Sequence, residues 1–177
     1  MKIEKVVVGS LCENCYVLCI EDKALVIDPG DEYDKINEII NNREILGVLI
    51  THNHFDHIGA LDELKNFYNV DVIDYKSNKN QIIGDFKFEI IDTKGHKEDA
   101  VTYYFKDSNA MFSGDFIFED SIGRCDLEGG DFDLMLKSIE LIKTYDSNII
   151  LYPGHGNSTT LANEIKNNIY FKGDLYE

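Results

Sequence analysis

The sequence is short of positive charge. It has 17 Lys and Arg residues against 33 Asp and Glu residues, which gives a formal net charge of -16 at pH 7. Proteins that bind nucleic acids rely on Lys and Arg side chains to neutralise phosphates. The acidic balance of this chain therefore argues against a nucleic-acid-binding function, including that of an RNA nuclease. We therefore expect no nucleic-acid partner.

Long apolar runs are also missing. No stretch reaches the length of a membrane span, and the early apolar run at 6–8 is far shorter than the core of a secretory signal peptide. We therefore expect a cytoplasmic protein without a membrane partner. Linkers, repeats and low-complexity tracts are absent as well, and 177 residues suffice for one well-buried core, so we expect a single domain over 1–177.

Cysteine is too scarce to build a disulfide framework. The four cysteines lie in a chain without an export signal, where reduced thiols are the default. Cys12 and Cys15 have the spacing of a zinc or redox pair, but no second pair completes four ligands. Cys15 and Cys19 alternate with apolar neighbours as in a strand that is buried on both faces. We interpret these cysteines as core residues.

Histidine, in contrast, is concentrated at one place. Three of the five histidines, His52, His54 and His57, lie within a few residues of one another, with Asp56 among them. Imidazole is the commonest protein ligand of divalent transition metals, and carboxylates also bind them. Such a cluster can supply more donors than one tetrahedral ion needs, which indicates two ions side by side.

The remaining histidines and one aspartate share a pattern. His96, Asp115 and His155 each come directly after a glycine that ends an apolar, strand-like run, and the histidine cluster follows the apolar run 46–50. In α/β sheets ligands gather outside strand ends, where glycine permits a sharp turn or a close backbone approach. Four such placements predict that the donors meet around metal ions.

The seven donors divide between two ions that share one carboxylate. If the strand conformation persists through His52 and His54, their side chains project from the same face and can share an ion. The first ion is expected to bind His52, His54 and His96, the second to bind Asp56, His57 and His155, and Asp115 to bridge both.

Two divalent ions with a bridging water suit metal-assisted hydrolysis. They lower the pKa of the water to about 7, which makes a nucleophile available at neutral pH. We expect Asp56 to hold or receive the proton of this water as the catalytic residue. His and carboxylate donors accept zinc, which we expect, and also iron or manganese. Bound cations would keep the site accessible to small anionic substrates in an acidic chain.

Hydrophobic periodicity predicts hairpins first and then strands interleaved with helices. Such an order indicates an α+β protein with two packed sheets and helices outside them. The segment 116–130 has no clear periodicity and is expected to be a loop, either functional or held by an ion pair of Arg124 with Asp126 or Asp131. Strands are expected at 3–8, 16–20 and 24–27 as an antiparallel meander, then at 46–50, 70–74, 86–92, 101–105, 110–112 and 148–152, and helices at 33–42, 58–68, 131–145 and 160–170.

From Thr51 to His57 the chain carries the signature T-H-x-H-x-D-H and resembles the metallo-β-lactamase superfamily. The segments 25–30, 112–115 and 154–156 are similar to further motifs of that family. Within it, 123–131 and 159–164 are most similar to small glyoxalase II-like hydrolases of bacteria. The resemblance implies an αββα four-layer sandwich, with two mixed β-sheets flanked by helices, and hydrolysis of hydroxyacyl thioesters such as S-lactoylglutathione.

The chain departs from the family pattern after the fifth donor. Where the family often has His-Thr-x-Gly-Ser, this chain reads His96, Lys97, Glu98, Asp99 and Ala100. Arg124, Lys94 and Lys97 are candidates for binding a carboxylate of the substrate. We expect a small-molecule partner, a thioester, while the oligomeric state cannot be read from the sequence.

Three other functions are compatible with these residues. The first is a mononuclear iron persulfide dioxygenase of the same fold, in which His52, His96 and Asp115 form a facial triad. The second is a hydrolase of another ester or of a lactone. The third is a metal-dependent sensor or scaffold, which is disfavoured because a sensor does not need an open position for water.

Overall fold

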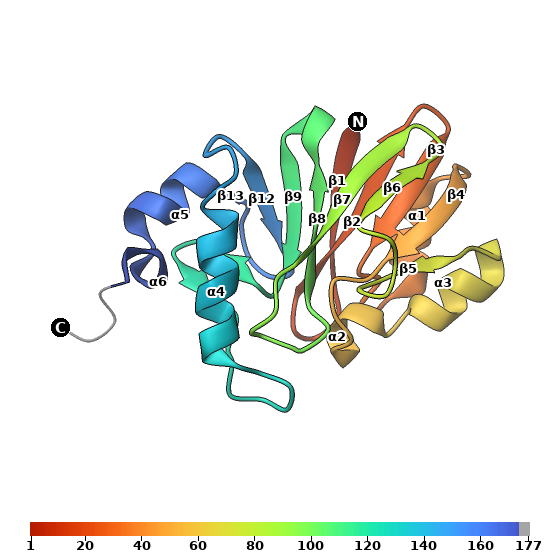
Figure 1. The fold of residues 1–177 in the computed structure, drawn as a ribbon. Helices are drawn as coiled ribbons and strands as arrows, with labels where there is room; N and C mark the ends of the chain where they lie inside the picture. The colour runs from red at the N-terminus through yellow and green to blue at the C-terminus, as the bar shows by residue number, and fades with distance from the viewer. Residues whose placement is uncertain (174–177) are drawn as a thin grey trace.

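Two mixed β-sheets face each other in the computed structural model of the chain, which describes residues 1–173 (Figure 1). The first sheet has the order β1-β2-β3-β4-β5. β1, β2 and β3 are antiparallel neighbours, as the predicted meander requires, whereas β3, β4 and β5 run parallel. The strands are β1 (Lys2–Val8), β2 (Glu13–Ile20), β3 (Lys23–Ile27), β4 (Glu44–Leu49) and β5 (Val72–Ile73).

The second sheet has the order β13-β12-β9-β8-β7-β6. β12 and β9 are parallel, and the other neighbours are antiparallel. Its strands are β6 (Asn80–Ile83), β7 (Phe86–Asp92), β8 (Val101–Phe105), β9 (Ala110–Gly114), β12 (Ile150–Pro153) and β13 (Thr159–Thr160).

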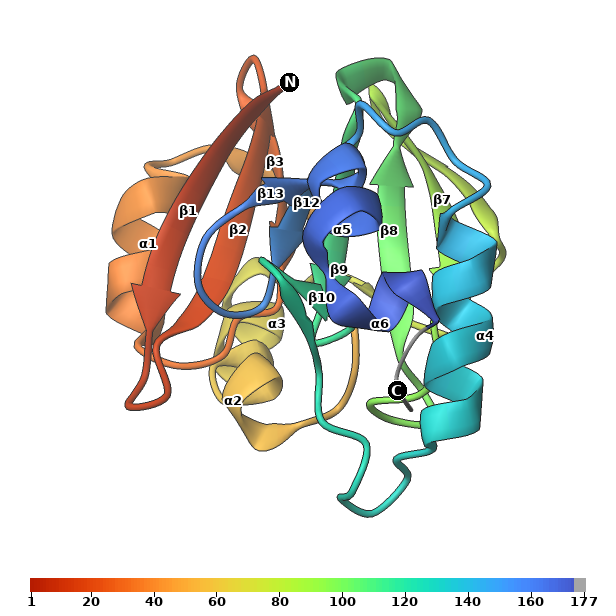
Figure 2. The same ribbon diagram turned by 90° about the vertical axis from the view of Figure 1, so that its left-hand side faces the viewer.

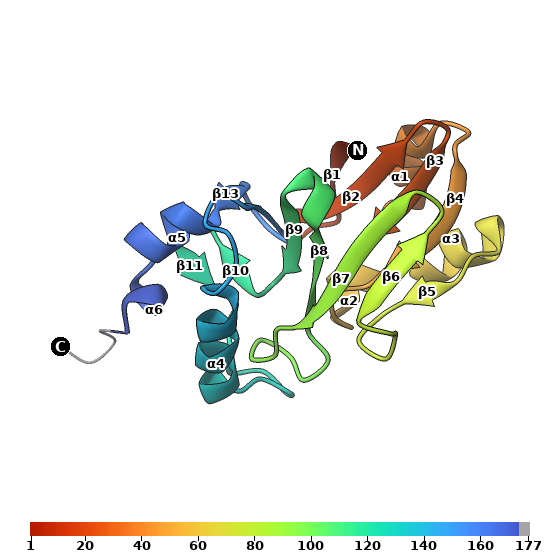
Figure 3. The ribbon, with the colours of Figure 1, turned by 45° about the horizontal axis from the view of Figure 1, so that its top comes forward.

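Helices cover the outer face of each sheet, and Figures 2 and 3 show the resulting layers. α1 (Tyr33–Ile40) and α3 (Leu61–Tyr68) lie against the first sheet, whereas α4 (Phe132–Ile142), α5 (Leu161–Asn167) and α6 (Ile169–Lys172) lie against the second. This arrangement is the αββα sandwich that was expected. Within residues 1–173, every helix is too short or too polar to cross a bilayer.

Strand β2 shows how the sequence builds these layers. Cys15 and Cys19 point into the core between the first sheet and its helices, while Tyr16 and Leu18 point into the core between the sheets. A central strand that is buried on both faces has this double apolar pattern. The interpretation of the cysteines as core residues is therefore confirmed for Cys15 and Cys19 but wrong for Cys12, which is exposed at the start of the strand.

The helix after the histidine cluster differs from the prediction. In place of one helix over 58–68, a short helix α2 (Phe55–Ile58) is followed by α3, with Gly59 and Ala60 between them. Strand β4 ends at Leu49, so the strand conformation does not persist through His52 and His54. The predicted reason for a shared face, a continuing strand, was therefore wrong. Irregular backbone and the first turn of α2 position these side chains instead.

The segment 116–130 is not a loop throughout. It contains a small hairpin of β10 (Ile117–Phe118) and β11 (Ser121–Ile122), which is a sheet of its own. Two-residue strands leave no periodicity to detect, and the same reason explains why β13 was missed. The expected helix 160–170 is divided at Asn168, whose side chain accepts a hydrogen bond from the backbone N–H of Tyr170 and so begins α6.

Candidate metal centre

The donors lie at one edge of the sandwich because of the strand directions. β12 is parallel to β9, and β7 runs in the same direction as β9 because β8 is antiparallel to both. The carboxyl ends of all three strands therefore meet at one edge, where α2 and the segment before it also lie (Figure 1). His96 follows β7, Asp115 follows β9 and His155 follows β12.

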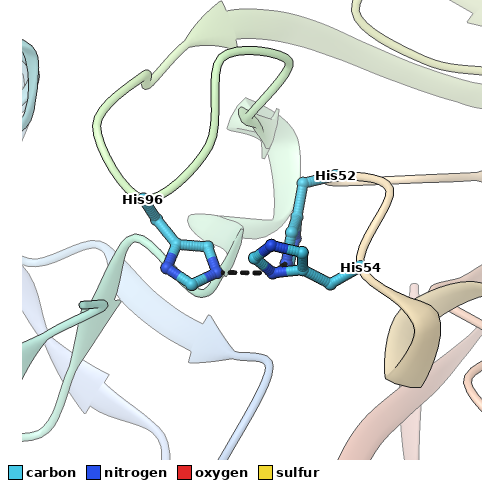
Figure 4. Close-up of side chains that lie close together, drawn as sticks. All are labelled: His52, His54 and His96. Atoms are coloured by element: carbon cyan, nitrogen blue, oxygen red, sulfur yellow. Dashed lines mark hydrogen bonds between the residues drawn. The ribbon is translucent and has the colours of Figure 1, made fainter. Parts of the chain in front are cut away.

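The first group of donors is formed by His52, His54 and His96. The Nδ1 atom of His54 lies 3.0 Å from Nε2 of His52 and 2.9 Å from Nε2 of His96. Figure 4 shows the side chains of His54 and His96 pointing toward each other from two loops, with their rings nearly perpendicular. Three nitrogen atoms converge on one point, as in the corner of a tetrahedral metal site.

The second group is formed by Asp56, His57 and His155. Oδ2 of Asp56 lies 3.2 Å from Nε2 of His155 and 3.9 Å from Nε2 of His57. Asp115 lies between the two groups: its Oδ1 is 3.3 Å from Nε2 of His57, and its Oδ2 is 3.6 Å from Nε2 of both His96 and His155. The carboxylate of Asp115 is thus placed to serve both groups.

Oxygen atoms behind the rings fix the direction in which each ring faces. The Nδ1 atoms of His96 and His155 lie 2.7 Å and 3.2 Å from the carbonyl oxygens of Arg124 and Leu11. A partner on Nδ1 leaves Nε2 as the atom that faces the centre, and such outer partners are typical of histidines that bind metals.

A buried carboxylate orients His57 in the same way. Oδ2 of Asp28 lies 2.9 Å from Nδ1 of His57 and accepts a hydrogen bond of 2.6 Å from the hydroxyl of Thr51. The backbone N–H of Thr51 donates to the other oxygen of Asp28 at 2.7 Å. All three residues are buried, so Asp28 links the donor loop to the exit of β3.

The charges of the donors balance one another in the metal-free chain. Burial lowers the pKa of His52, and the neighbouring His57 lowers it further. Burial acts against protonation of His57 too, but the carboxylates of Asp115 and Asp28 outweigh it and raise the pKa of His57 well above its usual value. The carboxylates around His57 therefore favour positive charge at this point of the centre.

The donor set fits a pair of divalent cations. Nε2 of His57 and Oδ1 of Asp115 are buried and have no hydrogen-bond partner within the described residues. A buried polar atom without a partner costs about 1–3 kcal/mol, and binding of an ion is one accepted explanation for such an atom. Both atoms face the centre, so cations there would satisfy them.

Glycines allow the strands to approach this closely. A Cβ atom on Gly154 would lie 2.4 Å from Oδ1 of Asp115 and 2.6 Å from Cε1 of His57. A Cβ atom on Gly123 would lie 1.7 Å from the carbonyl oxygen of Asp115. A side chain at Gly154 would displace the carboxylate of Asp115, and one at Gly123 would displace its backbone, which explains glycine at both positions.

Arg124 and Lys97, two of the candidates for contacts with the substrate, lie in different environments. The guanidinium of Arg124 donates from Nε and Nη2 to the carboxylate of Asp126 at 2.7 Å and 2.6 Å, as the ion-pair alternative for this segment anticipated. Its backbone carbonyl, and not its side chain, contacts the donor cluster. Lys97 follows His96 directly and is half-buried.

Sequence reasoning missed two buried carboxylates behind the donors. Asp28 follows the apolar run of β3 directly, without the glycine that precedes His96 and Asp115, so the pattern that identified those donors did not include it. Both side-chain oxygens of Glu13 are buried and find no hydrogen-bond partner in the described part of the chain, and its Oε1 lies 3.8 Å from Nδ1 of His57. Burial, reinforced by the charge of Asp28, raises the pKa of Glu13 to about 10.

A third missed residue, Asn14, holds the loop that carries His155. Its side-chain amide donates to the carbonyl oxygens of Pro153 and Gly156 at 2.9 Å and 3.0 Å, and its backbone N–H donates to the carbonyl of Gly154 at 2.7 Å. These partners are remote in sequence, so no local signal reveals them.

Known proteins are similar to this chain in sequence and in fold. The family model described as "Metallo-beta-lactamase superfamily" matches residues 12–80 and 79–155. The "Probable metallo-hydrolase YqgX" of Bacillus subtilis (strain 168) is 33% identical over 208 residues, covering 98% of this chain and 99% of that protein. The "Hydroxyacylglutathione hydrolase GloC" of Haemophilus influenzae is 28% identical over 207 residues, covering 95% of this chain and 97% of that protein.

A solved structure agrees over nearly the whole length. The crystal structure of BLEG-1, a B3 metallo-beta-lactamase, has a TM-score of 0.93 and 30% sequence identity, covering 97% of this chain and 100% of that chain. The αββα layers, the donor cluster at the strand exits and the family model lead to one conclusion. The chain belongs to the metallo-beta-lactamase superfamily.

Proposed function

We propose that this metallo-hydrolase cleaves a small hydroxyacyl thioester with the help of two divalent cations. The observation that carries the proposal is the position of Asp115 between two groups of three donors, with one of its oxygens buried and unpartnered. The donors would be His52, His54 and His96 for the first ion and Asp56, His57 and His155 for the second, with Asp115 shared.

The cations would supply Lewis-acid activation of water and positive charge for a developing oxyanion. Zinc is the first candidate because the donors are imidazoles and carboxylates, and iron and manganese accept the same donors. The chain itself contributes a proton acceptor. Asp56 has a partly exposed carboxylate, so its Oδ2 can take a proton from an attacking water and pass it to solvent.

A thioester suits the groups that the centre offers. The ring nitrogens of the histidines at the centre either face the other donors or contact oxygen atoms behind the rings, so none is free to act as a proton donor. A thiolate leaves with little assistance from an acid, so cleavage needs no further proton donor among these residues. The name of the Haemophilus influenzae relative gives hydroxyacylglutathione as the class of thioester to test first.

The proposal is tested by metal analysis and a substrate panel on the same preparation. Elemental analysis of the purified chain should give about two metal ions per chain. Steady-state assays of the metal-loaded protein against hydroxyacyl thioesters should show turnover that a chelator abolishes. No turnover across thioesters with different acyl and thiol parts would refute the proposal, and turnover of a lactone or an oxygen ester alone would replace it.

A persulfide dioxygenase is the competing outcome. It would need His52, His96 and Asp115 as a triad around one iron. The remaining four donors converge on the same centre and would then have no role. Oxygen uptake with glutathione persulfide, together with one iron per chain, would establish the dioxygenase in place of the hydrolase.

A further inference from the structure

Uncommitted positive charge is scarce around the donor cluster. The guanidinium of Arg124 is paired with Asp126, and both side chains are well exposed. Lys5, near the loop of His155, donates to the carbonyl of Gly156. Within residues 1–173, the ammonium of Lys97 has neither an ion pair nor a hydrogen bond to the protein.

The backbone and a neighbouring loop place Lys97 beside the first group of donors. It follows His96 in a tight turn, in which the N–H of Ala100 donates to its carbonyl at 3.3 Å. Its Cγ lies 3.7 Å from the position that a Cβ atom on Gly129 would occupy, so the glycine-rich segment lines one side of the lysine stem. The residue is half-buried, as for a lysine whose stem is partly covered while its ammonium remains accessible.

Lys97 carries its charge on the residue that follows His96, a member of the first group of donors. The rest of the chain is strongly acidic, with a net charge of -16, and would repel an anion. An anionic group that arrives at the centre therefore meets, directly after His96, a half-buried lysine whose ammonium has no protein partner among residues 1–173.

We propose that Lys97 binds a carboxylate of the substrate and that the enzyme prefers thioesters that carry such a carboxylate. This inference rests on the proposed function, because it specifies the class of thioester that reaches the centre. A hydrogen bond between the ammonium and a carboxylate should raise kcat/KM for the substrate with the free carboxylate by roughly 10- to 100-fold over the masked one. The carboxylate can belong to the thiol part or to the acyl part, and paired substrates distinguish the two.

The first pair of substrates is the S-lactoyl thioester of glutathione and that of glutathione diethyl ester. The second pair is the succinyl thioester of N-acetylcysteamine and the methyl ester of that thioester. The two members of each pair differ only in whether their carboxylates are free or masked as esters. We expect kcat/KM to be roughly 10- to 100-fold higher for the free carboxylate in at least one pair, through KM more than through kcat. The difference should shrink as salt is added, since salt screens the ion pair.

Three variants assign the preference to one side chain. Lys97→Met keeps the length of the side chain but removes its charge, and should abolish the preference. Lys97→Arg keeps the charge and should retain most of it. Lys137→Met is the matched control, because Lys137 is an exposed lysine of α4 and is not a candidate for the substrate carboxylate. Metal content is measured for each variant, so that a loss of metal is not mistaken for a loss of substrate contact.

The outcomes separate this inference from the proposed function. Thioester turnover with equal kcat/KM within both pairs would overturn the role of Lys97 and leave the hydrolase intact. An equal loss for masked and free substrates in Lys97→Met would also overturn it. If no thioester is cleaved, calorimetry with S-methylglutathione and its diethyl ester still decides: tighter binding of the free acid that disappears in Lys97→Met supports the carboxylate site, and equal binding refutes it.

Discussion

Oδ2 of Asp28 lies 2.9 Å from Nδ1 of His57, and both side chains are buried. The same carboxyl group also binds the backbone and the hydroxyl of Thr51. One residue at the exit of β3 thus fixes both the loop before the histidine cluster and the ring of one of its members.

The first prediction concerns this contact. Asp28→Asn should weaken binding of the second ion by about 10- to 100-fold, because an amide supports the basicity and the orientation of His57 less well. Asn suits the positive φ of 48° at this position, so the backbone should be preserved. Titration against a chelator measures the affinity, and Asp34→Asn, at an exposed position of α1, is the control. An unchanged second affinity would contradict the role of Asp28.

The second prediction concerns Asp56, which is proposed both as a donor to the second ion and as the proton acceptor. Asp56→Asn keeps an oxygen in the same place but removes the proton acceptor. We expect kcat to fall by about 10²- to 10⁴-fold while KM changes little. The first group of donors does not include Asp56, so the variant should retain at least one ion per chain by elemental analysis. A variant with wild-type kcat would show that another group takes the proton.

The third prediction concerns the close approach at Gly154. A methyl group there meets Oδ1 of Asp115 at 2.4 Å, so Gly154→Ala should destabilise the fold by about 1–3 kcal/mol and lower the metal content. Gly173→Ala is the control, since no atom of residues 1–173 lies within 4 Å of its added methyl group. With its positive φ of 74°, that control can lose stability but should keep its metal. Denaturant unfolding and elemental analysis are measured on both.

The fourth prediction concerns removal of the metal. Without cations, the centre buries unpartnered atoms of His57 and Asp115. A ligand that binds only the folded state stabilises it by about 2.7 kcal/mol at 100 times its Kd, so a chelator should lower the melting temperature and added zinc should restore it. Asp115→Ala should show a much smaller response to zinc. Equal responses in the two proteins would place the stabilising ion elsewhere.

Much of the site could be predicted because its signals are local. An apolar run, a glycine and a donor occur in this order at Gly95 and His96, at Gly114 and Asp115, and at Gly154 and His155, and each run marks a strand that ends beside a donor. Strand order then brings these exits to one edge. The fold could be predicted from the same apolar runs, since β2 and α4 display their buried faces in the sequence.

The remainder depends on contacts that a linear pattern does not contain. The contribution of Arg124 to the centre is a backbone carbonyl, which any residue type could provide. The carboxyl of Glu13 is buried by segments that are remote in sequence. α2 begins at Phe55 although no apolar period marks it, because four helical residues are too few to show one.

The order of the donors along the chain has a consequence for assembly. Four of them, from His52 to His57, are in place once the first sheet and α2 have formed, but His96, Asp115 and His155 come from the second sheet. Neither group of three donors is complete within one half of the sandwich, because the first group needs His96 and the second group needs His155. Tight capture of a cation must therefore wait until both halves have docked, so metal uptake during refolding would report the final closure of the chain and not an early step.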